Sequence, residues 1–334
     1  MGSNPKDTLS PALIDLIRAT PAAVLNQADR HGDGLVHFAA RAYALPLLTA
    51  LHDHGANMML VNEHGRQPLH EALGDLACTQ YLLATCHVNA NAMKRGDWTP
   101  VMIATNKDDL ATVQLLVRHG ALLDLKTKDR RTALHMAVQQ GNVELVQFLI
   151  KACPANLLAE TKSGRIPVQM AAALTDNLAA TGHRLTQDFL ATHRHEQLSH
   201  RDQAGCTVLV DAIVANQLAT VAWLATTAGA DLSTRDALGR QGWHHAAMLG
   251  HVAMLRLWHQ LTLQDLVGLN QPDTWDHWTP LMHAARHNHL DAVQCLLELG
   301  ADTSLLDKLG RSAKDIALLW QHHAVAQLLS MQDK

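Results

Sequence analysis

Lysines and arginines gather in one stretch of the sequence, where their side chains could bind an anionic partner or supply an amine nucleophile. From Lys94 to Arg165 there are eleven basic and seven acidic residues, a net charge of +4, whereas the whole chain carries −4. Only a neutral amine attacks an activated acyl group, and an ordinary pKa near 10.4 leaves about one lysine in two thousand neutral at pH 7. Neighbouring cations favour the neutral amine and would also favour simple docking. The residues of interest are Lys94, Arg95, Lys126, Lys128, Arg130, Arg131, Lys162 and Arg165.

Two tryptophans occupy the same point of the sequence pattern, directly before a Thr-Pro pair. Trp98 lies inside the basic stretch and Trp278 lies far from it. Aromatic and arginine side chains dominate the energetics of protein interfaces. Because we expect little core at this position, we predict that both indoles contact a partner, with Trp98 as the preferred anchor. The alternative interpretation is that these segments are charged only because they are solvated.

Signatures of catalysis are missing from the sequence. It contains no phosphate-binding loop, dinucleotide fingerprint, hydrolase nucleophile or kinase signature. The nearest string to a metal motif holds His195 and His200, whose spacing of five residues would not place both on one helix face. The five cysteines lack a C-x-x-C pair and are expected to be reduced, mostly buried thiols. We therefore expect a protein that is not an enzyme and has no metal or cofactor.

A tetrad similar to Thr-Pro-Leu-His recurs along the chain and indicates which elements position these residues. The tetrads begin at Gly34, Gln67, Thr99, Thr132, Ile166, Thr207, Gln241, Thr279 and Ser312. Their spacings are 33, 32, 33, 34, 41, 34, 38 and 33 residues, so six of eight lie within one residue of a 33-residue period. A Thr-Pro start caps a first helix, paired alanines allow close packing, and the Leu/Val-rich segment that follows predicts a second helix.

This pattern resembles the ankyrin repeat. The resemblance implies an all-α solenoid of about nine helix-turn-helix units joined by β-hairpin fingers. It also implies that the tetrad histidines make hydrogen bonds between repeats. The fingers of adjacent repeats lie side by side, so the basic residues should share one surface. We expect an N-terminal cap at 1–28, repeats at 29–330 and a tail at 331–334. Insertions near 173–200 and 258–278 are expected to lengthen, respectively, a turn between helices and a second helix or its exit loop.

Four strings extend the resemblance to a narrower group. They are KRGDWTPVMIA at 94–104, ACPANLLAETKSGRIPVQMAA at 152–172, HRDQAGCTVLVDAI at 200–213 and RDALGRQGWHHAA at 235–247. They are similar to the family of ankyrin repeat domain-containing protein sixteen. That resemblance implies alanyl-tRNA synthetase as partner and a role in limiting serine mischarging, in which lysines accept misactivated serine. The candidate acceptors are Lys128, Lys94, Lys126 and Lys162. Arg95 and Leu158 stand where that family has lysine, so we expect docking to be retained better than acceptor chemistry.

Composition sets the remaining expectations. With 48% hydrophobic and 17% charged residues the chain should fold, and no run of 18 apolar residues predicts a membrane span. The small net charge gives no general attraction to nucleic acid or membrane. We expect a monomer in the cytoplasm, with the nucleus as a second compartment, that binds protein and not nucleic acid or membrane. No signal for secretion or lipid attachment and no catalytic domain after Lys334 is expected. The alternative function is a generic ankyrin scaffold or effector with an unrelated protein partner.

Overall fold

The computed structural model describes residues 10–262 and 268–331, whose regular secondary structure is helical apart from two isolated β-bridges. The expected all-α class is therefore confirmed. The chain divides into two compact units, Met1–Asn156 and Leu157–Lys334. No described helix has both the length and the apolar character that crossing a membrane requires.

The first unit begins with two short helices and continues with helix pairs that each start at a tetrad. Its helices are α1 (Pro11–Ala19), α2 (Ala22–Leu25), α3 (Leu35–Arg41), α4 (Leu45–Asp53), α5 (Pro68–Ala72), α6 (Leu76–Ala84), α7 (Pro100–Asn106), α8 (Leu110–Arg118), α9 (Ala133–Gln140) and α10 (Val143–Ala152), followed by the 3-10 turn η1 (Pro154–Leu158). The tetrad supplies the helix cap, because the hydroxyl of Thr99 accepts a hydrogen bond from Met102 N at 3.4 Å. Helices α1 and α2 lie in the range expected for the N-terminal cap, of which residues 1–9 are outside the described part.

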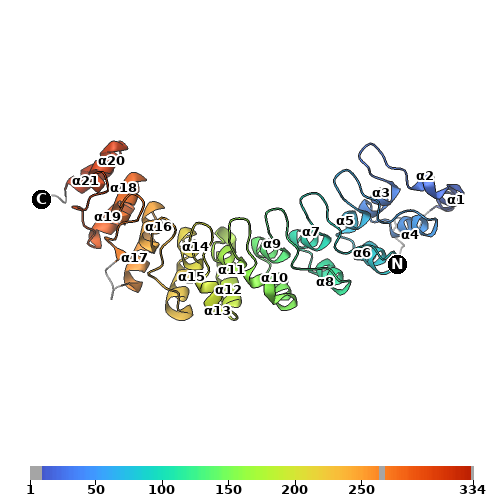
Figure 1. Ribbon diagram of the computed structural model, residues 1–334, viewed down its shortest axis with the longest axis horizontal. Coiled ribbons are helices and arrows are strands. Elements are labelled where there is room, and N and C mark those ends of the chain that lie inside the picture. Colours follow the sequence, from blue (N-terminus) through green and yellow to red (C-terminus); the bar gives the residue numbers. More distant parts are fainter. Residues whose placement is uncertain (1–9, 263–267, 332–334) are drawn as a thin grey trace. The chain divides into compact units, whose positions relative to one another are not determined.

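Helix pairs of the first unit stack side by side, first helix on first helix and second on second (Figure 1). The second helices contribute large side chains, and Leu82, Leu116 and Leu145 are completely buried. The first helices carry small residues where they meet, such as Ala39 and Ala40, which are also buried. The predicted division into a small-residue first helix and a bulky second helix is confirmed.

The second unit repeats this pairing. Its helices are α11 (Pro167–Ala172), η2 (Asp176–Leu178), α12 (Ala179–Leu190), α13 (Arg194–Ser199), α14 (Val208–Val214), α15 (Leu218–Trp223), the π-helical turn η3 (Leu224–Ala228), α16 (Gly242–Met248), α17 (Val252–Leu261), α18 (Pro280–Arg286), α19 (Leu290–Glu298), α20 (Ala313–Leu319) and α21 (His323–Ser330). Each tetrad again begins a first helix. The insertion expected near 258–278 follows the start of α17 and includes residues 263–267, which lie outside the described part.

The insertion near 173–200 forms more than the longer turn expected from the sequence. It contains η2, a twelve-residue α12 and the additional helix α13. Helix α12 packs so closely on α11 that a Cβ added at Gly182 would lie 2.5 Å from the carbonyl oxygen of Ala171. The buried amide of Gln197 in α13 donates hydrogen bonds of 2.7 and 2.8 Å to two backbone carbonyls. The inserted residues are therefore packed helical structure, and the expectation of a longer turn alone was wrong.

Within each unit, the loop that precedes a tetrad, here called a finger loop, is joined to the next finger loop by a backbone hydrogen bond. In the first unit Glu63 N donates to His31 O at 3.0 Å, Arg95 N to His64 O at 3.0 Å and Lys128 N to Gly96 O at 3.2 Å. The second unit repeats the bond between Gln203 N and Ser163 O, Ala237 N and Ala204 O, Thr274 N and Leu238 O, and Lys308 N and Asp276 O. The loops are irregular and not two-stranded hairpins, since the described residues pair only as isolated bridges.

Two tetrad histidines, His37 and His70, connect neighbouring repeats, as the sequence predicts. Nδ1 of His70 accepts a hydrogen bond of 2.9 Å from Gln67 N, so its Nε2 carries the proton and donates to Ala92 O at 3.0 Å. His37 makes the equivalent pair of bonds, including one of 3.1 Å from Nε2 to Arg66 O. Burial lowers the pKa of His70 to about 4, so the ring is neutral at pH 7.

Candidate protein interface

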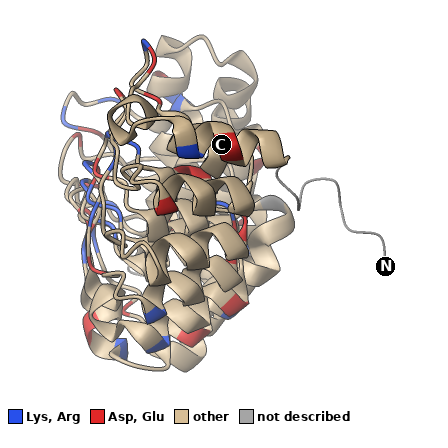
Figure 2. Cartoon of the chain, turned by 90° about the vertical axis from the view of Figure 1, so that its right-hand side faces the viewer, with Lys and Arg blue, Asp and Glu red and all other residues tan. Residues whose placement is uncertain are grey.

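Six of the eight basic candidates lie on two adjacent finger loops of the first unit. They form what we call the basic surface, which consists of Lys94, Arg95, Lys126, Lys128, Arg130 and Arg131. The backbone bond from Lys128 N to Gly96 O holds the two loops together. Figure 2 shows many of the Lys and Arg residues along loops that project from the helices. The other two candidates, Lys162 and Arg165, lie on a finger loop of the second unit.

Within the basic surface the side chains differ in how free they are to bind. Arg95, Lys128 and Arg130 are exposed, whereas Lys94, Lys126 and Arg131 are half-buried. Nη2 of Arg95 donates a hydrogen bond of 3.2 Å to the backbone oxygen of Glu63. The guanidinium of Arg131 donates a hydrogen bond to Oε1 of Gln139, which ties it to α9. Lys128 and Arg130 are therefore the cations best placed to meet a partner.

The backbone of Arg130 is unusual among the finger loops. The equivalent residue has φ between 71° and 81° and is glycine in six loops, at Gly32, Gly65, Gly164, Gly205, Gly239 and Gly310. Asp97, Arg130 and His277 replace it with φ of 62°, 59° and 59°. Aspartate and histidine are among the residues that tolerate this left-handed region, but arginine is not. The strain, of order 1 kcal/mol, makes Arg130 a candidate functional residue, because such strain concentrates at binding sites.

The two tryptophans have different surroundings. Trp98 is half-buried at the edge of the basic surface, and Nζ of Lys94 lies 5.2 Å from its ring centroid. Trp278 is only 6% exposed, and its Nε1 donates to Oδ2 of Asp307 at 3.2 Å. The guanidinium carbon of Arg286 lies 5.1 Å from the Trp278 ring centroid. The expectation that Trp278 is free to contact a partner was therefore wrong, because the next repeat supplies a core at this position.

The side chain of Arg165 forms an ion pair with Asp211 and so stabilises the interior of the second unit. Its Nη2 lies 2.5 Å from Oδ1 of Asp211, and Oδ2 of Asp211 accepts a hydrogen bond of 2.8 Å from Gln169. Burial raises the pKa of Asp211 to about 6, although the charge of Arg165 opposes this. Arg165 therefore compensates a buried carboxylate, which corrects its assignment to a partner-binding surface. Lys162 on the same loop is exposed.

Among the candidate acceptor lysines, Lys94 has surroundings that favour the neutral amine. Burial lowers its pKa, and the charge of Arg66 adds to the effect. Lys128 and Lys162 extend into solvent, and Lys126 is half-buried. Among the four candidates, Lys94 therefore has the surroundings that favour the neutral amine, and Lys128 and Lys162 are the exposed side chains.

The second unit brings together three side chains of types that can ligate a metal, which the sequence spacing does not reveal. Atoms of Cys206, Asp236 and His245 lie within 4.8 Å of one another. Nη2 of Arg240 lies 2.7 Å from Oδ2 of Asp236, and Nε2 of His245 lies 3.2 Å from the same oxygen. Although burial opposes it, these contacts hold the pKa of Asp236 well below its usual range, and burial raises the pKa of Cys206 to about 12. A protonated thiol and a carboxylate bound by arginine fit a buried polar network better than a metal site.

Comparisons with known proteins match the repeat pattern. A family model described as Ankyrin repeats (3 copies) matches residues 73–160 and 243–334. Protein glp-1 of Caenorhabditis elegans is 28% identical over 183 residues, which cover 50% of this chain and 14% of that protein. The phosphocholine transferase AnkX of Legionella pneumophila is 22% identical over 333 residues, 96% of this chain and 33% of that protein. The human NAD-capped RNA hydrolase NUDT12 is 47% identical over 53 residues, 16% of this chain and 12% of that protein. The chain spans about a third or less of the length of these relatives.

Proposed function

This chain belongs to the ankyrin-repeat family, and from that premise we propose that it is a protein-binding module that engages its partner with the basic surface of the first unit. The observation that carries the proposal is Arg130, an exposed cation in a left-handed backbone position where six other finger loops use glycine. Lys128 lies two residues away and is also exposed, and Trp98 borders the surface. Exposed cations beside an aromatic side chain suit an acidic face of another protein.

The finer proposal is that the partner is alanyl-tRNA synthetase and that binding limits serine mischarging. Its support is the set of four strings that resemble the family of ankyrin repeat domain-containing protein sixteen, one of which contains Lys94, Arg95 and Trp98. If a lysine captures the misactivated serine, its amine attacks the carbonyl carbon of seryl adenylate, an amide bond forms, AMP leaves and the proton of the amine passes to solvent. The lowered pKa of Lys94, caused chiefly by burial, supports that lysine as acceptor.

Replacing Arg130 with glycine tests the proposal, because it removes the charge and relieves the strain at the same time. For Arg130→Gly we expect the Kd for alanyl-tRNA synthetase to rise about three- to tenfold, measured by titration calorimetry. The free energy of unfolding should stay unchanged or rise by up to about 1 kcal/mol, because relief of the strained φ offsets the added chain entropy. Loss of binding through unfolding is thereby excluded.

Asp97→Gly is the matched control, since it places glycine at the equivalent left-handed position, with φ of 62°, without removing a positive charge. Its Kd should not rise. Unchanged affinity in Arg130→Gly would remove Arg130 from the interface, and a wild-type chain that does not bind the synthetase would overturn the choice of partner.

Adding ATP and serine to the mixture of chain and synthetase tests whether a lysine captures misactivated serine, which should add one seryl residue at Lys94. The adduct should be lost in Lys94→Arg but kept in Lys308→Arg.

A further inference from the structure

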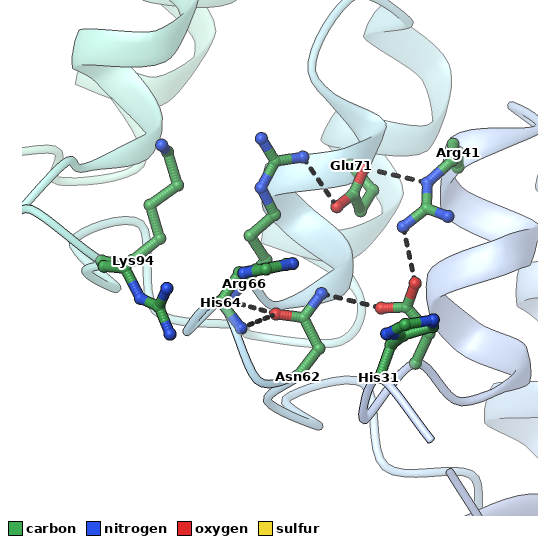
Figure 3. A pocket seen from close by; sticks show the side chains of 9 residues that line it. His31, Arg41, Asn62, His64, Arg66, Glu71 and Lys94 are labelled. Carbon is green, nitrogen blue, oxygen red and sulfur yellow. Dashed lines mark hydrogen bonds and ion pairs between the residues drawn. The ribbon is translucent and has the colours of Figure 1, made fainter. Parts of the chain in front are cut away.

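A pocket of about 630 Å³ opens among the first three finger loops of the first unit (Figure 3), and its lining residues do not include Lys128 or Arg130. Its charged lining consists of Arg41, Arg66, Lys94, Arg95, Asp33 and Glu71. Four cations and two carboxylates give this lining a net charge of +2. These charged side chains come from three successive repeats of the first unit.

Both carboxylates are already occupied. Oε2 of Glu71 accepts from Arg41 Nε at 3.2 Å, and Oε1 accepts from Arg66 Nη1 at 3.0 Å. Oδ2 of Asp33 accepts from Arg41 Nη2 at 2.9 Å, and Oδ1 accepts from Asn62 Nδ2 at 2.7 Å. The Glu71 and Asp33 side chains are only 6% and 11% exposed. They therefore fix the two guanidinium groups in place and offer little negative charge to the pocket itself (Figure 3).

The cations, by contrast, keep unused donors. The side chains of Arg41 and Arg66 are 46% and 40% exposed, and of the Arg66 guanidinium only Nη1 donates to an acceptor among the described residues. Nζ of Lys94 lies 5.2 Å from the centroid of the Trp98 ring and forms no ion pair among the described residues, although the charge of Glu71 is near enough to oppose the lowering of the Lys94 pKa. Figure 3 shows Lys94 on the far side of Arg66 from Glu71. The two carboxylates thus neutralise the positive charge only in part, which leaves the lining with its net charge of +2.

We propose that this pocket binds a phosphate monoester dianion, with Arg66 and Lys94 as its direct ligands. A phosphate monoester carries a charge of about −1.5 to −2 at pH 7, which matches the net charge of the lining. A guanidinium fork donates two parallel hydrogen bonds to phosphate, and lysine adds a point charge. A single carboxylate would leave positive charge unmatched. The pocket shares Lys94 and Arg95 with the basic surface, but the proposal goes beyond the proposed function, because it assigns a phosphate ligand and adds Arg66, which lies outside that surface.

The phosphate could belong to a phosphorylated side chain of a protein or to a small compound, and titration calorimetry separates the two. The probes are inorganic phosphate and a capped alanine peptide containing one phosphoserine, with matched peptides containing serine or glutamate. We expect saturable one-to-one binding of a phosphate probe and no binding of the serine peptide. Tighter binding of the phosphopeptide than of inorganic phosphate identifies a side-chain ligand, and equal binding identifies a small compound.

Substitutions of single residues test which side chains bind the phosphate. Lys94→Gln should weaken phosphate binding at least about tenfold, and because Lys94 forms no ion pair among the described residues this change should not disturb folding. Arg66→Gln should weaken it similarly, whereas Lys128→Gln on the basic surface should have no effect. Equal binding of the glutamate peptide, no saturable binding of either phosphate probe, or unaltered affinity in Lys94→Gln would overturn the proposal. No synthetase is present, so failure here leaves the role of Arg130 untouched.

Discussion

At the scale of single residues, Arg165 shows how a charge on a loop can stabilise the interior. Arg165→Gln would leave the buried carboxylate of Asp211 without its cation, although Gln169 would still donate. We expect the free energy of unfolding at pH 8 to fall by about 1 to 3 kcal/mol. The pKa of Asp211, raised by burial to about 6, should rise further. A raised carboxyl pKa penalises the folded state above it, so the loss at pH 5 should be smaller.

Urea unfolding at pH 5 and pH 8 measures both effects. Lys162→Gln is the matched control on the same loop, because Lys162 is exposed. It should change the free energy of unfolding by less than about 0.5 kcal/mol at either pH. Equal losses for the two variants would show that Arg165 does not support Asp211.

Local sequence predicts residues whose role is set within one repeat, and it fails for residues whose role is set by the next. The helix caps made by the Thr99 hydroxyl and by Nδ1 of His70 lie within the tetrad itself. Arg165 and Trp278 were misassigned because their partners, Asp211 and Asp307, lie in the following repeat. The pocket was missed for the same reason, since Arg41 and Glu71 are 30 residues apart in sequence. For Arg130 the signal was available, because aligning the finger loops reveals arginine where most have glycine.

At the scale of elements, each second helix stabilises the unit through one buried face. Leu116 of α8 is completely buried, and α8 is capped by Asp109, whose Oδ1 accepts from Thr112 N at 3.0 Å. Leu116→Ala should lower the free energy of unfolding by about 2 to 5 kcal/mol, because it removes apolar contacts and leaves a cavity. Leu122→Ala, at a side chain 52% exposed just beyond α8, should cost less than about 1 kcal/mol in the same urea titration. Similar costs would contradict the packing of α8.

The predicted starts of the first helices, one at each tetrad, are confirmed. Every tetrad begins a helix, because capping residues and proline act locally. The insertion near 173–200 broke the period, and its length alone could not distinguish a longer turn from additional helix. Packing contacts in the folded chain distinguish the two: Gly182 lies close against α11, and the amide of Gln197 is buried and hydrogen-bonded. Such contacts depend on tertiary packing and leave little trace in a single sequence.

At the scale of the whole molecule, buried tetrad histidines make stability depend on pH. Burial lowers the pKa of His70 in the first unit to about 4 and that of His244 in the second to about 3. Between these values and about 6.5 the unfolded chain binds more protons than the folded chain, so stability is retained above pH 6.5 and lost as pH falls. Each histidine should contribute a loss of order 3 kcal/mol between pH 7 and pH 4, measured by urea unfolding.

The chain itself suggests the control for this pH dependence. Gln169 occupies a tetrad histidine position, where its Oε1 accepts from Ile166 N at 3.2 Å and its Nε2 donates to Cys206 O at 3.0 Å. His70→Gln should therefore keep both hydrogen bonds while removing the titrating ring. The variant should lose less stability than wild type between pH 7 and pH 4. An identical decline would assign the pH dependence to other groups.

The backbone bonds between consecutive finger loops have a consequence for how the chain can evolve. Within each unit these bonds involve amide and carbonyl groups, for example Lys128 N and Gly96 O, and every residue type except proline supplies the amide. Exposed side chains on the loops, such as Lys128, can therefore mutate while the spacing between loops is inherited unchanged. Recognition and architecture are thus under separate selection, and a gene of this kind can acquire a new partner by successive point mutations without losing its fold along the way.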